Sequence, residues 1–146
     1  MKFSLIIDKE KDEEVIVVAH SSNDLTAQIE KIVMEHTGEN GFYVYNDDEI
    51  TRLDFSEIEC ITIIERKVYV ITLDGKRYRT NKRLCDIENG LPAYFIRINK
   101  SSLANEHRIK KFKTTFSGAV NAVFKCGYEE YVSRRCFANI KRRYEI

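Results

Sequence analysis

The chain is 146 residues long and 43% hydrophobic, which is enough for one packed domain or for one domain with a small appended lobe. Its longest apolar runs are far too short to span a bilayer, and its N-terminus turns acidic at once without a cleavage site, so we expect a cytoplasmic protein that is neither secreted nor membrane-spanning. The net charge of +1 conceals an uneven distribution, since residues 1–60 carry 5 Lys and Arg against 15 Asp and Glu, net −10, whereas residues 61–146 carry 19 against 8, net +11.

Two short apolar, β-branched runs open the chain at residues 2–7 and 14–19, and a charged segment separates them. This pattern predicts a β-hairpin. Apolar residues then recur at positions 25, 29, 32 and 33, on one face of a helix over residues 24–36 that Ser22, Asn23 or Asp24 can cap. Residues 1–46 are therefore predicted to form a small β-β-α lobe for dimerisation or partner binding.

The remainder, residues 47–146, consists mostly of short strand-like runs separated by polar or glycine-bearing turns. Asp74-Gly75 is the strongest hairpin signal in the chain and predicts a type I′ turn, which needs a positive φ at both central residues. The first predicted strand begins at residue 42, a little before this part of the chain. The predicted strands cover residues 42–46, 49–53, 58–64, 68–73, 76–80, 95–98, 102–104, 109–112, 119–124 and 129–132.

Two helices are predicted among these strands. Asn81 can cap a short helix over residues 82–89, and Ser133 can cap a final helix on which Phe137, Ile140 and Tyr144 share one face. The predicted fold class is therefore α+β, a mostly antiparallel β domain with short helices.

The sequence contains no convincing pattern of a catalytic site or a metal site. The four cysteines show no C-x-x-C pair and no His at ligand spacing, so we expect free thiols in or near the core. The three histidines lie far apart with no paired nucleophile, and the acidic turn at residues 47–49 lacks the spacing of a calcium loop. We expect no enzyme activity, metal or cofactor. The cysteines are Cys60, Cys85, Cys126 and Cys136.

Three segments then occur in the order of a known family. They are F-I-R-I-N-K-S over residues 95–101, Asn105, and V-S-R-R over residues 132–135. Together with the flanking strand residues, they resemble the LytTR-type DNA-binding domain of bacterial transcription regulators over roughly residues 47–146. The N-terminal piece resembles the extension of small stand-alone members without a receiver domain.

The resemblance implies an elongated fold of antiparallel sheets that sets loops into successive major grooves, usually as pairs on direct repeats. It implies double-stranded DNA and a second copy of the chain as partners, and a small inhibitory membrane protein as a further one. Cys136 stands where members often carry a bulkier residue, and residues 105–108 carry more charge than usual. The resemblance implies one DNA contact from the turn over residues 65–67, either Arg66 or Lys67. The other implied DNA contacts are Lys100, Ser101, Ser133, Arg134 and Arg135.

The strongly basic second half supplies further candidates for phosphate contacts. An alternative hypothesis is a protein-interaction module, in which the acidic half binds a partner and the basic half only balances its charge. That alternative predicts no salt-dependent retention on DNA. The additional phosphate candidates are Lys82, Arg83, Arg97, Arg108, Lys110, Lys111 and Lys113.

Overall fold

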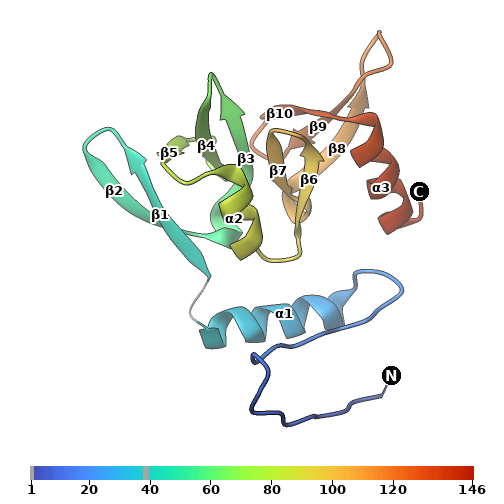
Figure 1. The fold of residues 1–146 in the computed structure, drawn as a ribbon. Helices are drawn as coiled ribbons and strands as arrows, with labels where there is room; N and C mark the ends of the chain where they lie inside the picture. The colour runs from blue at the N-terminus through green and yellow to red at the C-terminus, as the bar shows by residue number, and fades with distance from the viewer. Residues whose placement is uncertain (1, 38–39) are drawn as a thin grey trace.

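Ten strands form two antiparallel sheets in the computed structural model, which describes residues 2–37 and 40–146 (Figure 1). The larger sheet has seven strands in the order β2-β1-β5-β4-β3-β7-β6. Most neighbours in the sheet are also neighbours in the chain, because short turns join them. The strands are β1 (Gly41–Asn46), β2 (Glu49–Asp54), β3 (Ile58–Ile64), β4 (Lys67–Thr72), β5 (Arg77–Thr80), β6 (Phe95–Asn99) and β7 (Ser102–Asn105).

The smaller sheet has three strands in the order β10-β9-β8 and leads directly into the C-terminal helix. Two 3₁₀ turns and three α-helices complete the described part of the chain. The predicted α+β class and the predicted strand positions from residue 42 onward are confirmed. The remaining elements are β8 (Ile109–Thr114), β9 (Val120–Phe124), β10 (Glu129–Val132), α1 (Asp24–Thr37), α2 (Leu84–Gly90), α3 (Arg134–Tyr144) and the 3₁₀ turns Phe55–Glu57 and Glu106–Arg108.

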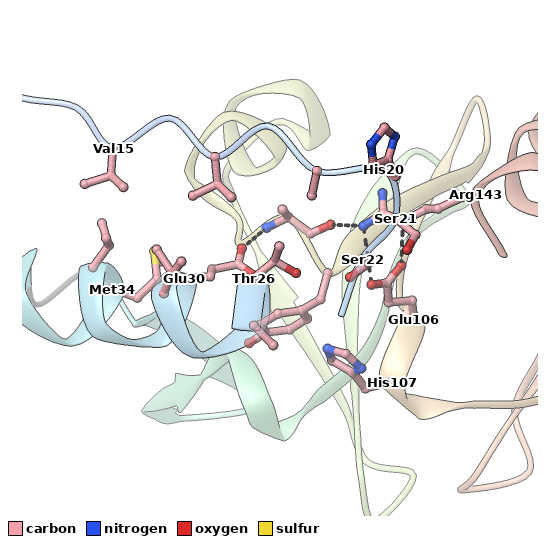
Figure 2. Close-up of a pocket in the computed structure, with 17 residues that line it drawn as sticks. Val15, His20, Ser21, Ser22, Thr26, Glu30, Met34, Glu106, His107 and Arg143 are labelled. Carbon is pink, nitrogen blue, oxygen red and sulfur yellow. Dashed lines mark hydrogen bonds and ion pairs between the residues drawn. The ribbon is translucent and has the colours of Figure 1, made fainter. Parts of the chain in front are cut away.

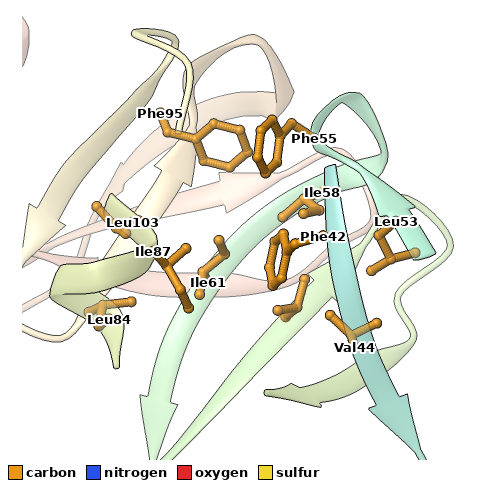
Figure 3. Close-up of a cluster of buried hydrophobic side chains, with 11 residues drawn as sticks. Phe42, Val44, Leu53, Phe55, Ile58, Ile61, Leu84, Ile87, Phe95 and Leu103 are labelled. Carbon is orange, nitrogen blue, oxygen red and sulfur yellow. The ribbon is translucent and has the colours of Figure 1, made fainter. Parts of the chain in front are cut away.

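Two apolar clusters hold the sheets together. The first lies under β1 to β4 and α2, where the rings of Phe42, Phe55 and Phe95 follow one another at centroid distances of 6.0 and 6.3 Å (Figure 3). The second lies between the two sheets and α3, around Phe124 and Ile140. Because burial of such side chains is the main favourable contribution to folding, the second cluster joins the small sheet to the large one.

The turns of the two β3–β4–β5 hairpins differ from the prediction. Glu65 and Arg66 are the two residues between paired Ile64 and Lys67, and both have positive φ, 50° and 67°, so the type I′ geometry lies here. At the predicted site, Gly75 has positive φ and Asp74 does not. Thr72 N–H bonds Lys76 O, so this loop has three residues, one more than a type I′ hairpin, and Gly75 N–H bonds Thr72 O within it. The hairpin at Asp74-Gly75 is confirmed, but its type I′ assignment is wrong.

The predicted N-terminal hairpin is also wrong, since residues 2–20 form no strand and their apolar side chains are exposed, including Phe3 at 87% and Val18 at 90%. A two-stranded hairpin with no layer to cover its apolar face is marginal in water. The predicted helix is confirmed as α1, with Asn23 as the capping residue, because the Thr26 N–H donates to Asn23 Oδ1 at 3.0 Å.

The boundary predicted between residues 46 and 47 falls inside the β1–β2 hairpin. Strand β1 pairs with β2 along its length and joins β5 through Tyr45 opposite Arg79, while Phe42 and Val44 enter the first cluster. The packed body therefore begins at Gly41. Helix α2 also starts later than predicted, with Arg83 in place of Asn81 before its first turn.

Candidate nucleic-acid interface

The structure brings Lys100 and Arg135 to one hollow on the surface, with a volume of about 820 Å³. Lys100 comes from the β6–β7 turn and Arg135 from the first turn of α3, and both side chains are exposed. Ser101 and Ser133 line the same hollow, whereas Arg134 does not. Two exposed cations beside one concave surface are suited to hold an anionic polymer.

The start of α3 is held in place by its cap and by the neighbouring sheet. Ser133 Oγ accepts a hydrogen bond from Cys136 N–H at 3.2 Å, and Ser133 N–H donates to Ile98 O in β6 at 2.8 Å. The predicted cap is thus confirmed. Because the cap joins α3 to β6, the helix start and the β6–β7 turn belong to one rigid unit.

The β3–β4 turn lies next to this unit. Ile63 N–H, near the end of β3, donates to Ser101 O at 3.0 Å. Strand β3 ends one residue later, at Ile64, and the turn that carries Arg66 begins there. Arg66 stands in the turn itself and Lys67 is the first residue of β4; both are exposed. Positive φ at a non-glycine residue costs free energy, and such residues often occur at functional sites.

A partly buried network of polar side chains joins the two sheets at the hollow, which one of its members, Glu130, also lines. Thr62 Oγ1 of β3 lies 2.7 Å from Ser102 Oγ of β7 and donates to Glu130 Oε2 of β10 at 3.0 Å. The Tyr128 hydroxyl donates to the same Glu130 oxygen at 2.7 Å. Burial, and then this hydrogen bond, raises the pKa of Tyr128, so the hydroxyl remains a protonated donor.

This network was not predicted from the sequence. The only local signal is Thr62, a hydroxyl inside the apolar run of residues 60–64, which as a buried group requires a partner. Its partner Glu130 lies 68 residues away, a pairing that no local pattern indicates.

Two arginines among the phosphate candidates, Arg97 and Arg108, already pair with carboxylates within the protein. Arg97 Nη2 lies 2.7 Å from Glu88 Oε2, and Arg97 Nη1 donates to Lys100 O at 2.6 Å. Arg108 contacts the fully buried Glu59 at 3.1 Å. These two guanidinium groups already neutralise carboxylates of the same chain, and a phosphate role for them stays a prediction.

The other phosphate candidates lie away from the hollow. Lys82 and Arg83 precede α2, where Lys82 Nζ stands 5.6 Å from the centre of the Phe42 ring. Lys110, Lys111 and Lys113 are exposed on β8, and Lys113 pairs with Glu129 at 3.5 Å. Their contacts with DNA likewise stay predictions.

A second hollow, of about 510 Å³, lies between residues 15–22, α1 and the body (Figure 2). Its polar groups are largely paired: Arg143 Nε lies 3.2 Å from Glu106 Oε2, and Ala93 N–H donates to the Glu30 carboxylate. Met34 of α1 packs against the first apolar cluster. This hollow marks where the N-terminal part attaches, at the end of the molecule opposite the β3–β4 turn (Figure 1).

The four cysteines are free thiols, as predicted, although Cys85 is exposed. Burial raises the pKa of Cys60 well above its usual value, which keeps this thiol protonated. Within residues 2–37 and 40–146, no three His, Cys, Asp or Glu side chains gather as a metal site would require. In the same described part of the chain, no helix has the length and apolar character to cross a membrane.

Known proteins resemble this chain in sequence and in fold. The family model of the LytTr DNA-binding domain matches residues 48–145. An uncharacterized HTH-type transcriptional regulator of Staphylococcus aureus strain MSSA476 is 30% identical over 100% of this chain and 99% of its own length, and one from the bovine strain RF122 is 31% identical over the same shares. A solved LytTr DNA-binding domain from Bacillus cereus superposes with a TM-score of 0.66 at 18% identity, over 73% of this chain and 98% of that one.

Proposed function

Because this chain belongs to the LytTr DNA-binding domain family, we propose that it is a transcription regulator that binds a specific double-stranded DNA sequence. Its full-length relatives bear names of transcriptional regulators. The observation that carries the proposal is the hollow that Lys100 and Arg135 share. Strand β3, which leads into the Arg66 turn, is bonded to the edge of this hollow from Ile63 N–H to Ser101 O. The proposal requires no catalytic step, metal or cofactor.

In this proposal, the turns between strands and the start of α3 contact the bases. An arginine at the mouth of a major groove can donate two parallel hydrogen bonds to guanine O6 and N7, and we assign this role to Arg135. Lys100 is a point charge on a flexible stem, which suits a phosphate or a single acceptor. Arg66 lies at the tip of a separate hairpin, which we propose reaches an adjacent groove.

We expect oligonucleotides selected by the full chain from a random pool to share one sequence. Binding of that sequence should weaken steeply with salt. If about six phosphates are contacted per subunit, the logarithm of affinity falls against the logarithm of salt concentration with a slope near −5. Fluorescence anisotropy on the selected duplex, between 50 and 200 mM salt, measures this slope.

The competing interpretation, a protein-interaction module, gives a different result. A pool without enrichment, together with a chain that passes through a heparin column unretained at low salt, would favour that interpretation over DNA binding. A membrane protein that binds residues 1–46 is compatible with both interpretations: it would be the partner of an interaction module, or it would regulate a DNA-binding chain.

We further propose that the chain pairs on direct repeats through residues 2–20. This segment leaves eight large apolar side chains at least 40% exposed, among them Ile7 and Ile16. It lies at the end of the molecule opposite the β3–β4 turn (Figure 1). Eight such side chains amount to an area on the order of the 800 Å² that each partner buries in a stable interface. Two copies could therefore pair while both bind DNA.

Removal of residues 2–20 is expected to convert a dimer into a monomer. The deletion spares the sheet, because the first strand begins at Gly41, whereas a truncation of residues 1–46 would remove β1 and its core side chains. Sedimentation velocity of the two proteins measures the mass. Ile50→Ser, at an exposed position on β2, is the control and should leave the mass unchanged. A deletion variant that sediments as a dimer would contradict this assignment.

A further inference from the structure

Asn99 occupies the junction between the two predicted recognition elements. It is only 8% exposed and stands at the end of β6, immediately before Lys100. Its side-chain Nδ2 donates to Tyr131 O at 2.6 Å, and its Oδ1 accepts from Ser101 N–H at 2.7 Å. One amide group therefore bonds the Lys100 turn and the end of β10 at the same time.

The second bond sets the shape of the turn. An asparagine that accepts from the backbone N–H two residues later forms an Asx turn, which restricts the backbone of the residue between them. In this protein, that residue is Lys100. The restriction fixes the direction in which Lys100 leaves the surface.

The first bond sets the position of the turn relative to α3. Tyr131 is two residues before Ser133, the cap of the helix that carries Arg135. The bond from Asn99 thus crosses from the large sheet to the small one, beside the backbone bond from Ser133 N–H to Ile98 O. Loss of the amide would remove this donor from the Tyr131 carbonyl. It would also remove the side-chain bond that ties the Lys100 turn to β10.

We propose that Asn99 is a positioning residue of the DNA interface, which holds Lys100 and Arg135 at the separation that one DNA site requires. This role rests on the proposed function above. It contributes to specific binding without contact between Asn99 and DNA, because side chains held in place before binding lose less conformational freedom when they bind. Non-specific attraction to phosphates does not need this geometry and depends on charge alone.

Asn105 offers a matched control. It is 2% exposed, its Nδ2 donates to Ile58 O at 2.9 Å, and its Oδ1 accepts from His107 N–H at 3.0 Å. The same residue type thus makes the same two kinds of bond. Asn105 lies at the far end of β7, which begins at Ser102 beside the Lys100 turn.

The experiment compares Asn99→Ala, Asn99→Ser and Asn105→Ala in the full chain, with the selected duplex and a scrambled duplex as probes. We expect Asn99→Ala to weaken binding of the selected duplex about tenfold, which corresponds to about 1.4 kcal/mol, with binding of the scrambled duplex and the salt slope unchanged. Asn105→Ala should lower the melting temperature at least as much and leave both affinities unchanged below that temperature.

Asn99→Ser separates the two bonds of Asn99. A serine hydroxyl can accept from Ser101 N–H but is too short to reach Tyr131 O, so a loss equal to that of Asn99→Ala assigns the effect to the bond between the sheets. If Asn99→Ala fails to fold, Asn99→Ser still tests the proposal. Equal losses for Asn99→Ala and Asn105→Ala, or wild-type affinity in both Asn99 variants, would overturn it. A wild-type chain that does not distinguish the two duplexes would instead overturn the proposed function, and the positioning role with it.

Discussion

Replacement of Arg135 by alanine is expected to weaken binding of the selected duplex by about 5- to 150-fold, the range that corresponds to the 1–3 kcal/mol of one bidentate contact to guanine. Arg135 is exposed at the first turn of α3 and borders the hollow that Lys100 also lines. Because the contact reads a base, Arg135→Ala should also relax the preference at one position of the site. Anisotropy on a set of single-base variants of the duplex measures both effects.

Two further variants separate the loss of the base contact from the loss of positive charge. Arg135→Lys keeps the charge but loses the planar pair of donors, so it should recover non-specific binding and not the base preference. Arg142→Ala removes an equal charge from the last turn of the same helix, where Arg142 bonds Asn139 at 2.5 Å, and should leave the preference unchanged. If Arg135→Ala and Lys100→Ala both bound the selected duplex as tightly as the wild type, the assigned surface would be wrong.

Arg108→Met is expected to destabilise the fold by about 3 kcal/mol, the largest effect on stability that we predict. Glu59 is fully buried in β3, accepts from Arg108 Nε and Nη2 at 3.2 and 3.1 Å, and accepts from Cys126 N–H at 3.2 Å. Removal of the guanidinium leaves a carboxylate in the core that keeps its hydrogen bonds to Cys126 but has lost its neutralising charge. The expected cost lies at the low end for buried pairs, because the Arg108 side chain is 27% exposed. Urea unfolding monitored by circular dichroism measures it.

The controls distinguish an unpaired buried charge from the loss of any ion pair. The double variant Glu59→Gln/Arg108→Met removes both charges and should recover part of the stability, because no carboxylate stays buried. Lys113→Met breaks the exposed pair with Glu129 at 3.5 Å and should cost less than about 1 kcal/mol. An Arg108→Met variant as stable as Lys113→Met would show that Glu59 does not depend on its partner.

The label "HTH-type" in the names of the relatives does not describe the elements of this chain. Between the described helices α1, α2 and α3 lie strands in every case, so no two of these helices follow each other across a short turn. A helix-turn-helix protein places its second helix in the major groove. Here the candidate contacts lie on strand-connecting turns and on the first turn of α3.

Local patterns were sufficient for most of the body. The strands from residue 42 onward, the three helices and the Ser133 cap follow from alternation, helical spacing and capping residues, which act within a few residues. The same reasoning failed at residues 2–19, where the pattern of a strand was present but no third strand or helix covered its apolar face. A strand requires a partner, and its own residues do not provide one.

From residue 42 onward, local sequence patterns were enough to predict the strands and turns, and they placed Lys100 in a turn and Arg135 at a helix end. Contacts between distant residues were not predictable in this way: Lys100 and Arg135 share one hollow, Asn99 bonds both of their elements, and Arg97 and Arg108 pair with carboxylates of the same chain. The physical reason is range: backbone preferences act between near neighbours, whereas hydrogen bonds and ion pairs form between whatever groups the folded chain brings within about 3 Å.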